Sequence, residues 1–135
     1  MFDAITQVPA PYNEPVNDFA PGTPARVALQ ARVKELAAER ADLVMTIGGE
    51  QRLGGGTPID VVQPHRKDAV LGTMQNATAA DVTAAVAAAR AAAAQWRGMS
   101  YDDRAAIFLK AADLLAGPWR STLAAATMLG QSKTC

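Results

Sequence analysis

The chain has 135 residues, with 13 Lys and Arg against 13 Asp and Glu, so its formal net charge is zero. This balance excludes a strongly basic nucleic-acid binder, and the single cysteine excludes a small secreted fold held by internal disulfides. Half of the residues are hydrophobic, but 30 of them are alanine, so the supply of large side chains for a core is modest.

The start of the chain has neither a basic segment nor an apolar one, and its first arginine is Arg26. We therefore expect no secretory or transit signal. No stretch reaches the roughly 18 apolar residues that a membrane-spanning helix needs. These features predict a soluble, cytoplasmic chain of one-domain length, without a membrane or nucleic-acid partner.

Residues 1–23 are rich in proline, which fixes φ, removes a backbone donor and favours extended geometry in the residue before it. We expect an extended arm that lies on other parts of the protein. Thr23 and Pro24 then form a helix start, with a hydroxyl cap before a proline in the first turn. The apolar spacing of Leu29, Val33 and Leu36 predicts a helix over residues 24–42.

Residues 43–76 predict short antiparallel strands. The β-branched run 43–47 and the run 50–53 flank Gly48 and Gly49, which is typical of a hairpin. Two further strands are expected over 59–62 and 70–74. Strands that follow one another without helices between them favour antiparallel pairing.

Residues 77–135 predict helices. Thr78 with Asp81, and Ser100 with Asp103, have the spacing of capping boxes. Gly117 and Pro118 then separate a third helix, which we expect to end at Gly130. Each of the first two helices carries an apolar stripe, and we expect both stripes to be buried against parts of the protein outside the 135 residues. The stripe of the first helix is Val82, Val86, Ala89, Ala93 and Trp96, and the stripe of the second, which faces inward, is Ile107, Phe108, Ala111, Leu114 and Leu115.

Residues 131–135 resemble the beginning of another element, with Ser132 as its cap and Cys135 in its first turn. Because natural domains rarely stop at such a point, we expect the chain to be a truncated piece of a longer protein.

Glycines at 48–49 and 54–56 raise the question of a phosphate-binding loop. The dinucleotide fingerprint needs its glycines between a strand and a helix, and here they lie between predicted strands with no helix N-terminus after them. Turns explain them better. Lys133 and Thr134 follow a glycine, but the glycines of a phosphate-binding P-loop are missing from the required places.

Other reactive side chains stand alone in the sequence. Cys135 has no visible companion base, and His65 has no second histidine or cysteine for a metal site. Asp102 and Asp103 suit the first turn of a helix, where they complement its dipole. Trp96 and Trp119 are expected to be core or docking anchors. The residues alone therefore identify no catalytic, cofactor-binding or metal site.

From residue 47 to residue 133 the order of short motifs resembles the aldehyde dehydrogenase superfamily. The matching pieces are Ile47-Gly48-Gly49-Glu50, Ile59-Asp60-Val61-Val62-Gln63-Pro64, Leu71-Gly72-Thr73, Ala77-Thr78-Ala79-Ala80-Asp81-Val82, Gln95-Trp96 and the run from Arg104 to Leu115. The arm, the first helix and residues 111–134 are similar to the subgroup that oxidises L-glutamate γ-semialdehyde in proline degradation.

This resemblance implies an α/β parent enzyme, of which the present residues form an α+β part: an arm, a helix, short antiparallel strands and a portion of a helical bundle. It implies NAD as cofactor, an aldehyde substrate and a homo-oligomer. It also implies a cysteine nucleophile, a glutamate base and a nucleotide-binding domain. None of these matches a position here, and Cys135 does not have the family's sequence context, so we expect the 135 residues to be inactive alone.

Two alternatives stay open from the sequence. The chain could be a self-standing helical interaction module whose amphipathic faces dock a partner. It could also belong to another subgroup of the superfamily, with a different aldehyde as substrate.

Overall fold

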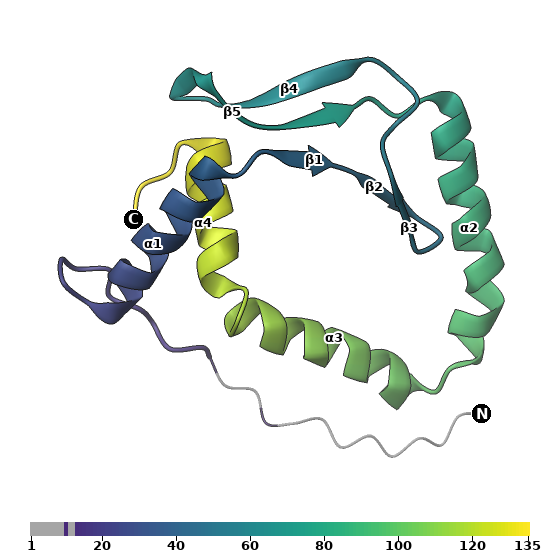
Figure 1. The fold of residues 1–135 in the computed structure, drawn as a ribbon. Coiled ribbons are helices and arrows are strands. Elements are labelled where there is room, and N and C mark those ends of the chain that lie inside the picture. Colours follow the sequence, from purple (N-terminus) through teal and green to yellow (C-terminus); the bar gives the residue numbers. More distant parts are fainter. Residues whose placement is uncertain (1–9, 11–12) are drawn as a thin grey trace.

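A computed structural model of the chain describes residue 10 and residues 13–135. The elements follow one another around an open ring (Figure 1). In chain order they are α1 (Pro24–Ala38), β1 (Ala41–Leu43), β2 (Met45–Ile47), β3 (Glu50–Arg52), β4 (Pro58–Gln63), β5 (Arg66–Gln75), α2 (Ala79–Gly98), α3 (Tyr101–Ala116) and α4 (Arg120–Gln131). The order confirms the predicted α+β organisation, with strands between one leading helix and three trailing helices.

The arm before α1 has no regular secondary structure over residues 13–20, and it lies against the helices. Arg120 pairs with the carboxylate of Glu14 at 3.3 Å and donates a hydrogen bond to the carbonyl of Pro15 at 3.2 Å. Arg26 donates to the carbonyl of Phe19 at 2.9 Å. The described part of the arm therefore lacks regular secondary structure and is held to α1 and α4. The rest of the predicted arm, residues 1–9 and 11–12, lies outside the described residues.

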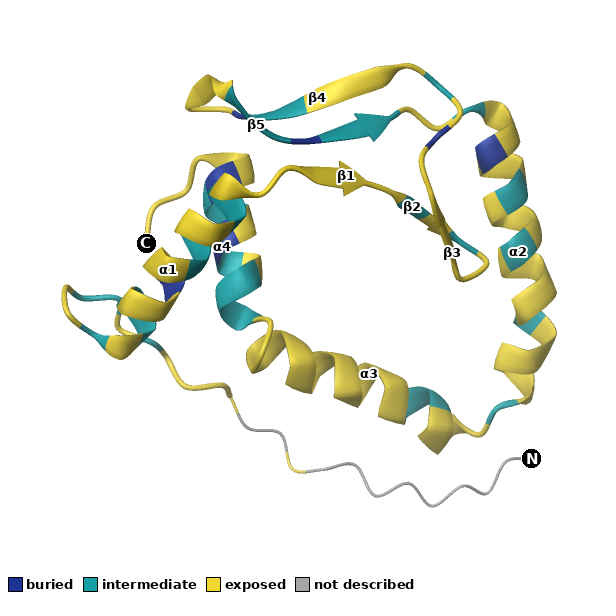
Figure 2. Cartoon of the chain, viewed as in Figure 1, coloured by how far each residue is buried: buried dark blue, intermediate teal, exposed yellow. Residues whose placement is uncertain are grey.

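Helices α1 and α4 lie side by side and form the most enclosed part of the described chain (Figures 1 and 2). Leu29 of α1 and Ala125 and Leu129 of α4 are the buried apolar residues of the described segment. The helices are also joined by a hydrogen bond of 3.0 Å from Arg32 Nε to the Thr122 hydroxyl. Segments about 90 residues apart in the sequence thus share a small core.

Helix α1 begins as predicted but ends early. The Thr23 hydroxyl accepts a hydrogen bond from the Arg26 amide, with Pro24 in the first turn. The helix ends at Ala38 rather than at residue 42. Residues 41–43 instead form β1, because their backbone groups find partners on β5.

The two antiparallel hairpins agree with the prediction. In the first, Ile47 of β2 pairs with Glu50 of β3, and Gly48 and Gly49 make the turn with φ of 62° and 87°. Both values lie in the left-handed region that glycine adopts without steric cost. The second hairpin pairs β4 with β5, and its register shifts around Val62.

Strand β1 departs from the predicted antiparallel arrangement. It pairs parallel to β5, with Ala41 opposite Gly72 and Leu43 opposite Met74, and completes a sheet of order β1-β5-β4. A side chain at Gly72 would collide with the carbonyl oxygen of Ala41. Glycine at this position therefore permits the close approach of the two strands.

Local caps start α2 and α3 where the sequence predicts. Thr78 and Asp81 form both hydrogen bonds of a capping box. The Ser100 hydroxyl accepts from the Asp103 amide at 3.1 Å and donates to the Asp103 carboxylate at 2.7 Å. The break at Gly117 and Pro118 is also observed, and α4 follows it.

The two apolar stripes are uncovered within the described chain, which agrees with the expectation that they pack against parts of the protein outside the 135 residues. Val82 is 56% exposed and Phe108 is 66% exposed, and no residue of α3 is buried (Figure 2). The chain exposes 10234 Å² in total, whereas a compact monomer of 14.1 kDa exposes about 6,700 Å². Helices α2 and α3 thus form where their local sequence predicts, but no other element of the described chain covers their apolar stripes.

We predict that the isolated 135-residue chain retains its helices but that α3, which has no buried residue, lacks fixed tertiary packing. Its exposed apolar surface will bind a hydrophobic dye, and its far-ultraviolet circular dichroism will melt over a broad temperature range. Calorimetry and analytical ultracentrifugation check this expectation. A sharp calorimetric transition in a monodisperse monomer would contradict it.

Candidate functional site

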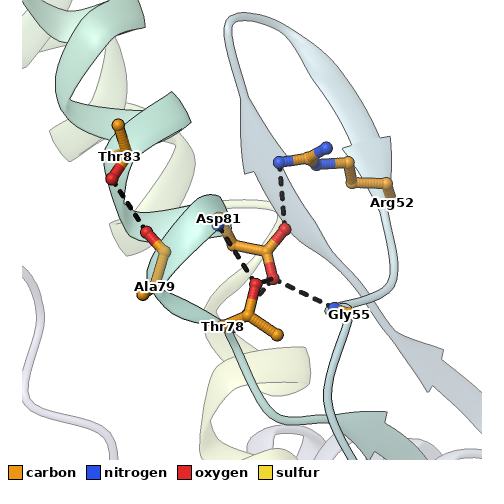
Figure 3. A network of polar contacts seen from close by, with 6 residues as sticks. All are labelled: Arg52, Gly55, Thr78, Ala79, Asp81 and Thr83. Atoms are coloured by element: carbon orange, nitrogen blue, oxygen red, sulfur yellow. Dashed lines mark hydrogen bonds and ion pairs between the residues drawn. The ribbon is translucent and has the colours of Figure 1, made fainter.

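The best-organised polar cluster joins the loop after β3 to the first turn of α2 (Figure 3). At its centre the carboxylate of Asp81 accepts hydrogen bonds from the Thr78 amide and the Thr78 hydroxyl, both at 2.8 Å, and from the Gly55 amide at 3.0 Å. Arg52 completes the group with an ion pair of 3.1 Å to the other carboxylate oxygen. We call these four residues the Asp81 junction.

The glycine run 54–56 allows this loop to approach the chain in front of α2. Added side chains at Gly54 and Gly56 would both collide with the carbonyl oxygen of Asn76. That carbonyl accepts a hydrogen bond from the Gly56 amide at 2.9 Å, and the Asn76 amide donates to the carbonyl of Thr57 at 3.1 Å. The loop is thereby held where the Gly55 amide can reach Asp81.

The junction keeps Asp81 ionised. Hydrogen bonds from the Gly55 amide, the Thr78 amide and the Thr78 hydroxyl, with the charge of Arg52 as a smaller contribution, lower the pKa of Asp81 from 3.8 to about 2. Burial opposes this shift, since the residue is only 7% exposed. The carboxylate also lies at the positive end of the α2 dipole.

This arrangement corrects one step of the sequence interpretation. The glycines at 54–56 were expected to have no helix N-terminus beside them, yet Gly55 lies against the start of α2. The anion at that helix end is the chain's own carboxylate, so the amide of Gly55 and the amide of Thr78 already have their acceptor. The sequence showed the cap formed by Thr78 and Asp81, but not its contacts with Arg52 and Gly55.

His65 is an exposed turn residue, as its sequence context predicts, whereas the end of α4 differs from the prediction. His65 Nδ1 lies 3.0 Å from the hydroxyl of Ser132, so this exposed loop residue has a partner across the fold. Ser132 does not start a new helix. It ends α4 at Gln131 with a left-handed φ of 58°, and Cys135 is exposed beyond it rather than in a helical first turn. Lys133 and Thr134 likewise lie outside regular structure.

The remaining candidates lie apart from the Asp81 junction. Asp102 and Asp103 occupy the first turn of α3, as predicted. Trp96 meets Phe108 edge to face, with ring centroids 6.3 Å apart, and is 38% exposed, while Trp119 is 53% exposed. Both tryptophans thus lie at the surface of the described chain rather than in a core.

A search of residue 10 and residues 13–135 finds no group of three or more His, Cys, Asp and Glu side chains arranged to hold a metal ion. No helix in the described part of the chain combines the length and apolarity needed to cross a membrane. The Asp81 junction joins two segments of the fold, and the donors to its carboxylate come from the chain itself.

Comparisons with known proteins agree on one family. The profile of the Aldehyde dehydrogenase family matches residues 52–135. A Delta-1-pyrroline-5-carboxylate dehydrogenase of Agaricus bisporus is 38% identical over 130 residues, which is 96% of this chain and 24% of that protein.

Among solved structures, the Delta-pyrroline-5-carboxylate dehydrogenase from Mycobacterium tuberculosis superposes with a TM-score of 0.93 at 59% identity, covering 98% of this chain and 25% of that one. The same enzyme bound with NAD superposes with a TM-score of 0.91 at 58% identity, covering 96% and 24%. The chain thus spans about a quarter of the length of the proteins that it matches.

We predict that the Gly55 amide reports the ionisation of Asp81. Because the folded pKa lies below the unfolded one, the bonds to the carboxylate stabilise the junction above about pH 4 and are lost as the pH falls toward 2. The Gly55 amide shift in nuclear magnetic resonance spectra will follow this change. In Asp81→Asn the pH-dependent step will be absent. A Gly55 shift that titrates identically in the variant would refute the assignment.

A second prediction concerns the close approach of the loop. Gly54→Ala places a methyl group against the Asn76 carbonyl, and overpacking of this kind costs about 1–3 kcal/mol. The opening free energy of the first turn of α2, measured by amide hydrogen exchange, will fall by that amount. Gly98→Ala is the matched control, because nothing lies within 4 Å of its added methyl group. Equal effects of the two substitutions would show that the glycine run is not needed for docking.

Proposed function

The chain belongs to the aldehyde dehydrogenase family, and we propose that the whole protein oxidises L-glutamate γ-semialdehyde, the open form of 1-pyrroline-5-carboxylate, to L-glutamate with NAD. The observation that carries this proposal is the match to the Mycobacterium tuberculosis enzyme, 59% identical over 98% of the chain. The family profile begins at residue 52, so this match also includes β1, β2, α1 and the described arm. The arm and α1 are among the segments whose sequence favoured this subgroup.

The reaction removes a hydride from the aldehyde carbon and adds an oxygen atom from water, so that the product is a carboxylate. The family resemblance implies a cysteine nucleophile, which forms a thioester, and a glutamate that activates water for its hydrolysis. We assign neither role to a residue of this chain. Cys135 is exposed and follows the end of α4, and it takes no part in the proposal.

NAD, when bound, accepts the hydride, and the glycine loop at the start of α2 does not fit its pyrophosphate. A pyrophosphate needs backbone donors that are free at a helix N-terminus. Here the glycine loop lies at the start of α2, but its Gly55 amide already donates to Asp81. We therefore propose that the nucleotide site of the whole protein lies outside these residues. The role of this segment in the proposal is structural.

A chimeric enzyme tests the proposal. In it, these 135 residues replace the matching quarter of the Mycobacterium tuberculosis enzyme, and NADH formation is followed with 1-pyrroline-5-carboxylate. We expect kcat/KM to stay within about tenfold of the parent enzyme, or about 1.4 kcal/mol of transition-state stabilisation. Short aliphatic aldehydes are the control substrates.

Two outcomes would contradict the proposal. A folded chimera without NAD-dependent turnover would remove its basis, and a clear preference for a control aldehyde would favour another subgroup. The homo-oligomeric state and the cytoplasmic location implied for the whole protein stay predictions, to be checked by analytical ultracentrifugation and by cell fractionation.

A further inference from the structure

Helix α4 ends differently from the other three helices. The residues that follow α1, α2 and α3 each donate a backbone amide to the carbonyl four residues earlier, at 3.1, 3.1 and 3.0 Å; they are Glu39, Met99 and Gly117. Within the described residues, the backbone amide of Ser132 after α4 makes no such bond. Ser132 instead has a left-handed backbone, with φ of 58° and ψ of 32°. The end of α4 is therefore fixed in another way.

The left-handed conformation of Ser132 is costly for a residue with a side chain. Among the described residues, Ser132 is the only non-glycine residue with a positive φ. Glycine ordinarily supplies this conformation at a helix end, because a Cβ atom crowds the backbone there. Gly130 is available in α4, but the helix continues past it to Gln131. An interaction from outside the helix is thus needed to hold Ser132.

His65 supplies this interaction. Its Nδ1 atom lies 3.0 Å from the hydroxyl oxygen of Ser132, although the two residues are 67 positions apart in the sequence. A serine hydroxyl can donate a hydrogen bond to a ring nitrogen or accept one from it. The contact therefore suits either tautomer of His65.

Both partners of this contact are carried by anchored segments. His65 lies in the turn between β4 and β5, just after Gln63, which pairs with Arg66. Gln63 is 3% exposed, and Leu129 in the last turn of α4 is 6% exposed. Strand β4 and helix α4 are in contact (Figure 1). Packed backbone on both sides therefore sets the distance between His65 and Ser132.

The β4–β5 turn also brings basic residues to this end of α4. The C-terminal end of a helix is the negative end of its dipole, and α4 has no basic residue in its last turn. His65 is followed by Arg66 and Lys67 in the sequence. The turn can thus act through one hydrogen bond or through its charge, and substitutions at His65 and at Lys67 distinguish the two.

We propose that His65 is a positioning residue that latches the end of α4. Its ring holds Ser132 in the left-handed conformation and thereby sets the direction in which the chain leaves the helix. The β4–β5 hairpin, rather than a glycine within α4, thus determines where and how this helix ends. The proposal does not rest on the proposed function, and its test involves no enzymatic turnover.

Nuclear magnetic resonance of the 135-residue chain tests the latch. The Cα and Cβ chemical shifts of Ser132 report its backbone conformation, and amide hydrogen exchange reports the opening of the last turn of α4. His65→Ala removes the ring, whereas the amide of His65→Asn can replace Nδ1. Ser132→Gly needs no latch, because glycine adopts the left-handed conformation without steric cost. Lys67→Ala is the matched control at an exposed residue of the same hairpin.

In the unsubstituted chain Ser132 will have left-handed chemical shifts. His65→Ala will abolish them and raise the opening equilibrium of the last turn of α4 about fivefold, as expected for the loss of one hydrogen bond. His65→Asn will restore both quantities. Lys67→Ala will change the opening equilibrium by less than about twofold. In the Ser132→Gly background, His65→Ala will likewise have an effect below about twofold, because the two residues no longer interact.

Four results would overturn the proposal. Ser132 could lack left-handed shifts in the unsubstituted chain, or keep them in His65→Ala. An effect of Lys67→Ala as large as that of His65→Ala would assign the stabilisation to charge at the helix end. An undiminished effect of His65→Ala in the Ser132→Gly background would show that the ring acts on another part of the fold.

Discussion

The position of helix α2 on the strands depends on the carboxylate of Asp81, because this group joins the first turn of the helix to the loop after β3. Helix α2 has few other contacts with the strands, and its first turn is held to the loop after β3 by the bonds from Gly55 and Arg52. The same carboxylate caps the helix through Thr78. The Asp81 side chain therefore both caps α2 and sets the position of this helix. The glycines at 54 and 56 lie where the loop backbone approaches the backbone of Asn76 closely.

Away from this junction, local interactions shape the elements more than burial does. Hydroxyl caps at Thr23, Thr78 and Ser100 start three helices, while the buried apolar residues of the described chain are confined to α1 and α4. Strong caps combined with little buried apolar surface give helices that lack a sufficient core of their own. This combination is expected of a segment that completes its packing against other parts of a larger enzyme.

The elements that follow from short-range chemistry could be predicted from the sequence. The starts of α2 and α3, the Gly48–Gly49 turn and the break at Gly117 each depend on residues within four positions of one another. Strand β1 could not be predicted in this way, because its pairing joins Ala41 to Gly72, and this partner lies outside the local pattern. The family resemblance, which rests on the order of short motifs, predicted the enzyme family. The hydrophobic periodicity predicted only the secondary-structure elements.

The Asp81 junction likewise combines a local contact that the sequence predicts with long-range contacts that it does not. Its cap is visible in the sequence as Thr78 and Asp81, but the contact with Gly55 spans 26 residues. The three consecutive glycines at 54–56 were the available signal, but two strands separate them from the capping box, and local spacing predicts only a turn there. The stripes on α2 and α3 were recognised as apolar, but their spacing does not say whether the covering surface is within the same 135 residues.

The central claim is that these residues acquire a fixed structure as part of an aldehyde dehydrogenase. Amide hydrogen exchange along α3 tests it most directly, compared between the 135-residue chain and the same residues within the chimeric enzyme. The account predicts rapid exchange of α3 in the chain alone and strong protection in the chimera, with a smaller difference for α1 and α4, which already cover each other. Equal protection of α3 in both would contradict the account, since the segment would then be complete by itself.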